Sequence, residues 1–114
     1  MERVKPIILA DNETGRKFTL EFDRESVRFA EMHKFDIDDV GRFPMLKVPE
    51  LFYYAFRMHH KNISRAETDR ILFDELGGMP GGMIERLGQL YSAPFEALAM
   101  GDGEPKNARM TVEL

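Results

Sequence analysis

The stretch KFTLEFD, residues 17–23, decides the fold, because it holds the clearest strand and the start of the first helix. Its three large apolar side chains, at positions 18, 20 and 22, alternate with polar ones, as in a strand with one buried face. Asp23 suits the position before a helix, where its carboxylate can accept hydrogen bonds from free backbone N–H groups. The stretch therefore predicts a half-buried strand that leads into a helix from about Arg24.

Upstream of this strand the sequence predicts its hairpin partner. Ile7–Ala10 is a short apolar run, and the five polar residues that follow end in Gly15, which can supply the positive φ that closes a turn. A two-stranded hairpin is marginally stable by itself in water, so the rest of the chain must cover its apolar face.

Downstream, the spacing of apolar residues predicts about four helices. The first carries an untidy apolar set, namely Val27, Phe29, Ala30, Met32 and Phe35. After a polar connector over Asp36–Pro44, the second is expected to begin with Pro49 and to extend to Lys61. Its apolar stripe is the best defined in the chain: Val48, Leu51, Phe52, Ala55, Phe56 and His59.

Two further helices complete the predicted fold. Ser64 and Glu67 have the spacing of a capping box, which opens a helix that carries Ile71, Leu72 and Leu76 and stops at Gly77–Gly78. The last helix has Ile84, Leu87, Tyr91, Phe95 and Leu98 on one stripe, and Pro94 is expected to kink or restart it near Ala93. Gly88, inside this helix, indicates either close approach by another element or a tolerated weakness.

Length and composition limit the classes of protein to which the chain can belong. The chain has 114 residues, of which 43% are hydrophobic and 32% charged, which predicts one globular domain over residues 1–100. Residues 101–114 are predicted to be a flexible C-terminal tail, whose alternating end, Met110–Leu114, can form a short strand. The fold class is therefore α+β and mainly helical, with the N-terminal hairpin packed against the helices.

Charge and residue usage argue against several functions. Sixteen Lys and Arg against 20 Asp and Glu give a net charge of −4, so we expect no nucleic-acid partner. The chain has no cysteine, which excludes disulfides and thiolate chemistry. No apolar run is long enough for a membrane span, and we expect neither membrane association nor secretion, which leaves the cytoplasm as the default location.

Candidate catalytic and metal-binding groups are sparse. His59 and His60 diverge by about 100° on a helix and cannot easily share a metal, and His59 is predicted to be a neutral, hydrogen-bonded core residue. Asp36–Gly41 resembles the start of a calcium loop but lacks the later oxygen ligands, which favours a solvated acidic connector. The glycine-rich segment over residues 77–82 favours a sharp turn over a phosphate cradle. We expect no enzymatic activity, no metal and no cofactor.

The methionines and aromatic residues favour a role in protein binding, although they also suit a small core. Eight methionines in 114 residues is a high number, and their flexible thioether chains adapt to irregular partners. Aromatic side chains beside the main stripe of the second helix are typical of interfaces and of core rims. The predicted partner-binding residues are Tyr53, Tyr54, Met58, Met110 and Val112.

Five stretches together carry a resemblance to a known family: Phe18–Glu31, Leu51–His60, Asp74–Gly78, Leu90–Leu98 and Lys106–Leu114. They resemble a family of small proteins encoded in tailed phages and in prophages of Gram-positive bacteria, which is similar to the phage tail assembly chaperones. The similarity spans about residues 16–114. It implies a non-enzymatic factor that binds the tape measure and tail tube proteins in the host cytoplasm and is absent from the mature virion.

Other readings of the sequence stay open. The protein can be a structural phage component, such as a head–tail connector or a minor tail protein, and it can form a homo-oligomer. A small enzyme or a metal-dependent regulator would use His33, His59 or His60. The resemblance carries over no catalytic residue, so the binding residues above rest on the sequence pattern alone.

Overall fold

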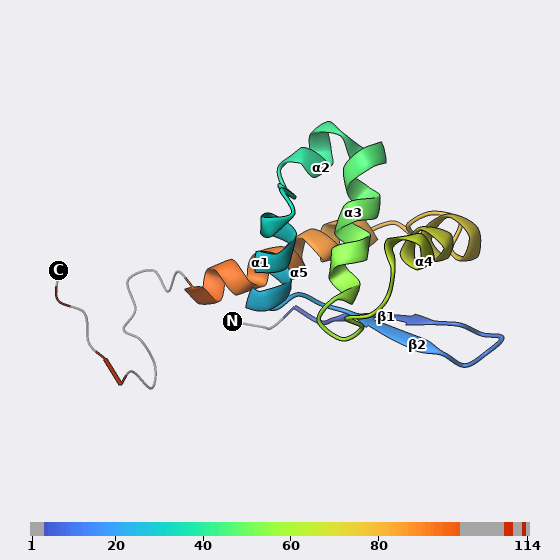
Figure 1. Cartoon of the computed structure of the whole chain (residues 1–114). Helices are drawn as coiled ribbons and strands as arrows, with labels where there is room; N and C mark the ends of the chain where they lie inside the picture. The colour runs from blue at the N-terminus through green and yellow to red at the C-terminus, as the bar shows by residue number, and fades with distance from the viewer. Residues whose placement is uncertain (1–3, 99–108, 111–112, 114) are drawn as a thin grey trace.

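Residues 4–98, 109–110 and 113 are described by the computed structural model, in which an N-terminal hairpin lies against a group of helices (Figure 1). The strands β1 (Ile7–Ala10) and β2 (Lys17–Leu20) pair antiparallel, with Ile7 opposite Leu20. Gly15 closes the loop with a φ of +75°. The predicted hairpin and α+β class are confirmed.

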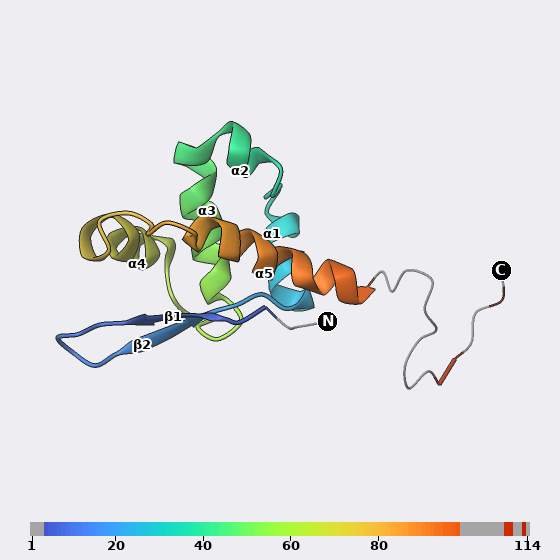
Figure 2. The ribbon, with the colours of Figure 1, turned by 180° about the vertical axis from the view of Figure 1, so that it is seen from behind.

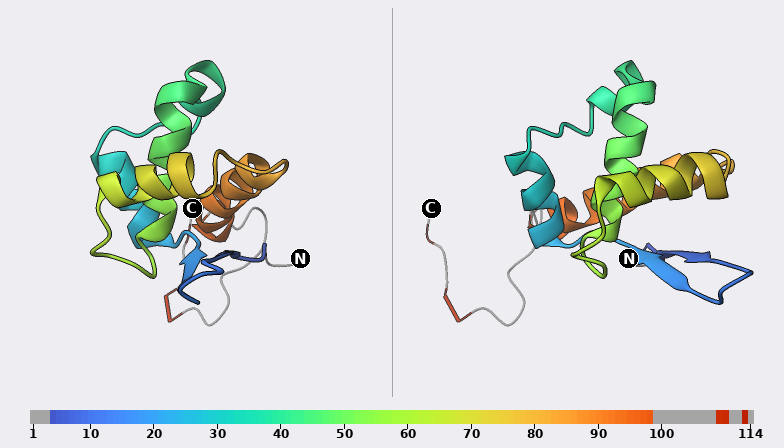
Figure 3. Two further views of the ribbon diagram at one scale, coloured as in Figure 1. Left: turned by 90° about the vertical axis from the view of Figure 1, so that its right-hand side faces the viewer. Right: turned by 45° about the vertical axis from the view of Figure 1, so that its right-hand side comes forward.

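In the described part of the chain, five α-helices and one π-helical segment follow the hairpin. They are α1 (Arg24–Met32), α2 (Asp39–Arg42), α3 (Pro44–Phe56), α4 (Arg65–Arg70), η1 (Ile71–Glu75) and α5 (Met83–Leu98). α5 contacts both α1 and α3, and Figure 2 shows it crossing in front of them. The hairpin lies along one side of the helices, with β2 against α3 (Figure 3).

One hydrophobic core joins the hairpin to the helices. The alternating residues of the deciding stretch all reach it, since Phe18, Leu20 and Phe22 are at most 6% exposed. The ring of Phe56 on α3 packs edge-on against Phe18 at 5.5 Å between ring centroids. The hairpin is thus stabilised by the helices, as its short strands require.

The helix caps follow the sequence closely. Asp23 accepts a hydrogen bond from the Ser26 backbone N–H at 2.8 Å, and the Ser26 hydroxyl accepts one from the Asp23 N–H at 2.8 Å. Ser64 accepts a hydrogen bond from the Glu67 N–H at 3.1 Å. The predicted starts of α1 and α4 are therefore confirmed.

The predicted bounds of the second helix are wrong at both ends. α3 begins at Pro44, whose fixed φ suits the first turn, and the buried Pro49 lies inside the helix. The predicted connector before it contains the short helix α2. At the other end α3 stops at Phe56, because the chain turns back so that His60 can reach β2.

The third predicted helix is divided, and its end is confirmed. α4 leads directly into η1, where the Leu76 N–H bonds the Ile71 carbonyl at 2.8 Å, the wide spacing of a π-turn. Gly77 and Gly78 then adopt φ values of +69° and +115°, which favour glycine. Ile71 and Leu72 are buried as predicted, but Leu76 is 38% exposed.

The last helix differs from its predicted pattern. α5 continues through Pro94 without restarting. Its buried residues are Met83, Leu87, Leu90 and Tyr91, whereas Ile84, Phe95 and Leu98 are 42–72% exposed, because α1 and α3 cover only one side of the helix. A Cβ at Gly88 would meet no atom within 4 Å, so close approach does not explain this glycine.

The predicted tail lies almost wholly outside the described residues. Of residues 101–114 the structure describes only Arg109, Met110 and Glu113, all of them exposed. The predicted terminal strand and the flexibility of the tail therefore stay predictions. No helix in the described part of the chain combines the length and apolarity needed to cross a membrane.

Candidate partner-binding surfaces

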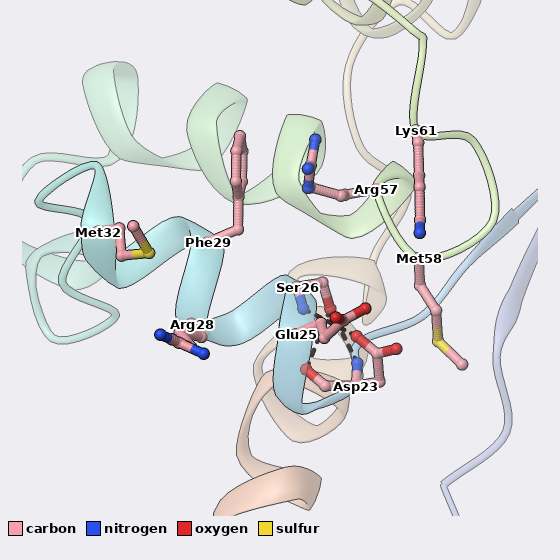
Figure 4. A pocket seen from close by; sticks show the side chains of 9 residues that line it. All are labelled: Asp23, Glu25, Ser26, Arg28, Phe29, Met32, Arg57, Met58 and Lys61. Carbon is pink, nitrogen blue, oxygen red and sulfur yellow. Dashed lines mark hydrogen bonds between the residues drawn. The ribbon is translucent and has the colours of Figure 1, made fainter.

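A groove of about 310 Å³ lies between α1 and the chain that leaves α3 (Figure 4). Its walls include two methionines, Met32 and Met58, and the ring of Phe29. Met32 is 68% exposed, although the sequence placed it among the apolar residues of α1. Flexible thioether chains beside an aromatic ring form an adaptable apolar surface.

Charged side chains surround these apolar groups. Arg28, Arg57 and Lys61 line the groove together with the carboxylates of Asp23 and Glu25. The Arg57 guanidinium lies over the Phe29 ring, 3.6 Å from its centroid, and so links the end of α3 to α1. The groove therefore has an apolar centre surrounded by side chains of both charges, the same arrangement as the apolar core and polar rim of a protein interface.

The hydroxyl in this groove is committed to structure. Ser26 is 1% exposed, and its Oγ both accepts a hydrogen bond from the Asp23 N–H and donates one to the Asp23 carbonyl. No imidazole lines the groove. The two hydrogen bonds of Ser26 join its hydroxyl to the Asp23 backbone, where they complete the cap of α1.

A second surface is the apolar tip, which we define as Phe43, Met45 and Leu46. These side chains lie where α2 meets α3, at the end of the helical group opposite the hairpin (Figure 1), and are 53%, 84% and 67% exposed. No prediction covered these three residues as a group, because the expected connector ended at Pro44 and the expected apolar stripe of the second helix began at Val48. The apolar run around Pro44, a residue that suits the first turn of a helix, was the feature of the sequence that could have indicated this surface.

The predicted partner-binding residues occupy different environments. Tyr54 is 8% exposed, and its ring contacts Phe35 at 5.3 Å between centroids, so it is part of the core. Tyr53 is half-buried against the same core, and Met58 lines the groove. Met110 is 80% exposed, whereas Val112 lies outside the described residues. Their role in binding stays a prediction.

Burial also affects the acidity of the aromatic hydroxyls. Burial, with a smaller contribution from Glu50, raises the pKa of Tyr54 above its usual value of 10.0. Burial raises the pKa of Tyr91 to about 12. Both phenols therefore stay protonated near neutral pH and act as core groups.

Each of the three imidazoles contacts a different residue of the fold. The prediction that His59 lies in the core is wrong: its side chain is 37% exposed, and its Nε2 lies 2.9 Å from an oxygen of the buried Glu21. His60 packs on Phe18 and accepts a hydrogen bond from the Thr19 N–H at 3.0 Å, while His33 Nδ1 lies 2.8 Å from the Phe29 carbonyl. Among the described residues no three His, Cys, Asp or Glu side chains are grouped to hold a metal ion.

The His60 contact predicts a pH dependence of stability. Only the neutral ring can accept the Thr19 N–H, and burial, followed by His59 and Arg16, lowers the pKa of His60 below its usual 6.5. The unfolded chain therefore binds this proton at a higher pH than the folded chain does. The contribution to the free energy of unfolding should be complete above about pH 6.5 and decrease as the pH falls toward the lower folded-state pKa.

Urea unfolding of the natural chain and of His60→Gln at pH values from about 7.5 to 5 would measure this dependence. Glutamine can accept the same N–H without titrating in this range. We expect the variant to lose less stability than the natural chain on acidification. Equal losses in the two proteins would show that His60 does not cause the dependence.

The model of a family described as a domain of unknown function (DUF5055) matches residues 3–114. No curated protein and no solved structure matches the chain.

Proposed function

The chain belongs to the DUF5055 family, whose model spans almost its whole length, and from this premise we propose that it is a non-enzymatic assembly factor that binds other polypeptides. The resemblance to phage tail assembly chaperones makes the proposal specific. Its clients are then the tape measure and tail tube proteins of a tailed phage.

The apolar tip is the observation that carries the proposal. Three large side chains, Phe43, Met45 and Leu46, are more than half exposed within four consecutive residues. Their desolvation by a partner is favourable, at roughly 25 cal/mol for each Å² of apolar surface covered. Apolar groups gathered on the outside of a small domain are typical of protein-binding sites.

The groove beside Met32 and Met58 supports the same proposal. Its apolar centre can adapt to a client, and its charged rim can favour one orientation of that client. The described serine and histidine side chains discussed above are engaged in caps and hydrogen bonds within the fold. A holding function requires surfaces of this kind and no reacting group.

An assembly factor of this kind acts at a defined place and stage. It works in the host cytoplasm during virion assembly and leaves before the particle is complete. It needs no cofactor, metal, nucleic acid or membrane. The net charge of −4 helps to keep such a protein dissolved while its apolar groups are uncovered.

Co-purification from a lysogen tests the proposal. A tagged copy of the chain is expressed during prophage induction, isolated, and its partners are identified by mass spectrometry, with purified virions analysed in parallel. We expect the tape measure protein among the partners and the tagged chain to be absent from virions. Stoichiometric incorporation into virions would instead support a structural component, such as a connector or minor tail protein. Failure to recover any tail protein would contradict both.

A further inference from the structure

The outer edge of β1 has no strand partner in the described part of the structure. β1 pairs with β2 in a register that places Leu9 opposite Phe18, and the Asp11 N–H bonds the Arg16 carbonyl at 2.8 Å. The antiparallel hydrogen-bond pattern alternates along a strand. The N–H and C=O groups of Ile8 and Ala10 must therefore point away from β2.

The opposite strand confirms this assignment. The Thr19 N–H, directly across from Ile8, points out of the hairpin and bonds His60 at 3.0 Å. The outer edge of β2 is thus used by α3 and the turn after it. The corresponding groups of Ile8 and Ala10 bond no residue of another described element.

The side chains of β1 also favour pairing. All four residues of the strand are apolar, and Ile8 is 55% exposed. A cavity of about 510 Å³ is lined by residues of β1 together with Phe18, Ile71 and Leu76. Natural proteins usually protect an open edge with charges, proline or a bulge within the strand, and β1 has none of these.

Charge along this edge is arranged with opposite signs at its two ends. Lys5 precedes β1, and the Arg86 guanidinium lies 3.4 Å from the Lys5 carbonyl. Asp11 and Glu13 follow the strand in the loop. If a second β1 strand pairs antiparallel with the first, the acidic end of each strand lies beside the basic end of the other. If it pairs parallel, like charges lie beside each other.

We propose that β1 pairs antiparallel with β1 of a second copy, which creates a four-stranded sheet with the order β2–β1–β1–β2. In the register that uses every free group, Ile8 lies opposite the partner's Ala10, and Leu9 lies opposite the partner's Leu9. Four backbone hydrogen bonds form, and Glu13 is brought toward the partner's Lys5. The hairpin lies at one side of the helices (Figure 3).

This inference is independent of client binding, because it uses neither the apolar tip nor the groove. A two-fold arrangement contacts the same edge on both copies, so any substitution acts at two places. A reversal of charge at each end should therefore have a doubled effect. That property makes the pairing testable with exposed residues that take no part in the core.

Lys5→Glu and Glu13→Lys provide the test. Each variant alone places like charges at both ends of the pair, and we expect its dimer dissociation constant to rise about tenfold in sedimentation equilibrium. A mixture of the two variants restores opposite charges at both ends. The mixture should therefore associate about as tightly as the natural chain, which no effect within one copy can produce. Arg42→Glu, on α2, is the matched control and should leave the constant unchanged.

Disulfide trapping tests the register, since the natural chain has no cysteine. Leu9→Cys should form a covalent dimer on mild oxidation, because the two positions face each other in the close, non-hydrogen-bonded arrangement. Ile8→Cys should not, because its counterpart is displaced by two residues and lies beyond disulfide reach. A monomer at all concentrations, or a dimer indifferent to mixing, would overturn the proposal. Equal trapping of the two variants would overturn the register.

Discussion

Replacing Phe56 with alanine should lower the free energy of unfolding by about 3–5 kcal/mol. Phe56 is fully buried and packs edge-on against Phe18 and Phe52, at 5.5 and 5.0 Å between ring centroids. It therefore joins β2 to α3, and its removal leaves a cavity where the hairpin meets the helices. Small domains are stable by only about 5–15 kcal/mol, so we expect much of this stability to be lost.

Phe73→Ala is the control for this prediction. Phe73 is 54% exposed on η1, so the same truncation there should change the free energy of unfolding by less than about 1 kcal/mol. Urea unfolding followed by circular dichroism measures both variants. Similar small losses in the two proteins would mean that the hairpin does not depend on Phe56.

Serine at all three positions of the apolar tip should reduce client recovery about tenfold or more, if the proposed function is correct. Partial burial of Phe43, Met45 and Leu46 against a client contributes on the order of 1 kcal/mol per side chain, and 1.4 kcal/mol corresponds to a tenfold change in affinity. Because these side chains are exposed, the thermal midpoint should change little. Co-purification with quantitative mass spectrometry gives the recovery.

A matched variant separates specific binding from general adhesion. Phe73→Ser combined with Leu76→Ser also removes exposed apolar side chains, but on η1 and at its C-terminal cap. We expect it to retain client recovery. If both variants lose recovery equally, the contact is non-specific, and if neither does, the apolar tip is not the binding surface.

The local signals in the sequence were sufficient for the hairpin and the caps. Period-two alternation placed Phe18, Leu20 and Phe22 in the core, and Gly15 closed the loop as expected. Asp23 and Ser64 cap the helices that the sequence assigned to them. These features depend on neighbours within a few residues, which is why the sequence alone could predict them.

The helix bounds and the surfaces depended on distant contacts. A proline suits the first turn of a helix, and the prediction placed Pro49 there, whereas α3 begins at Pro44 and continues through Pro49. The end of α3 at Phe56 reflects the contact of His60 with Thr19, 41 residues earlier. The apolar tip was not predicted because its residues lie at the junction of the expected connector and the expected second helix, where they show no helical periodicity.

By itself, the amino-acid sequence determined the class of fold, the order of strand and helix, and most of the core, because alternation, capping and chain breakers act locally. Only the tertiary structure decided which apolar residues stay in solvent, since α1 and α3 cover one side of α5 and leave Phe95 and Leu98 exposed. It alone also separated Tyr54 in the core from Met58 in the groove. Burial depends on what the rest of the chain places over a residue, and a single sequence pattern carries no record of that.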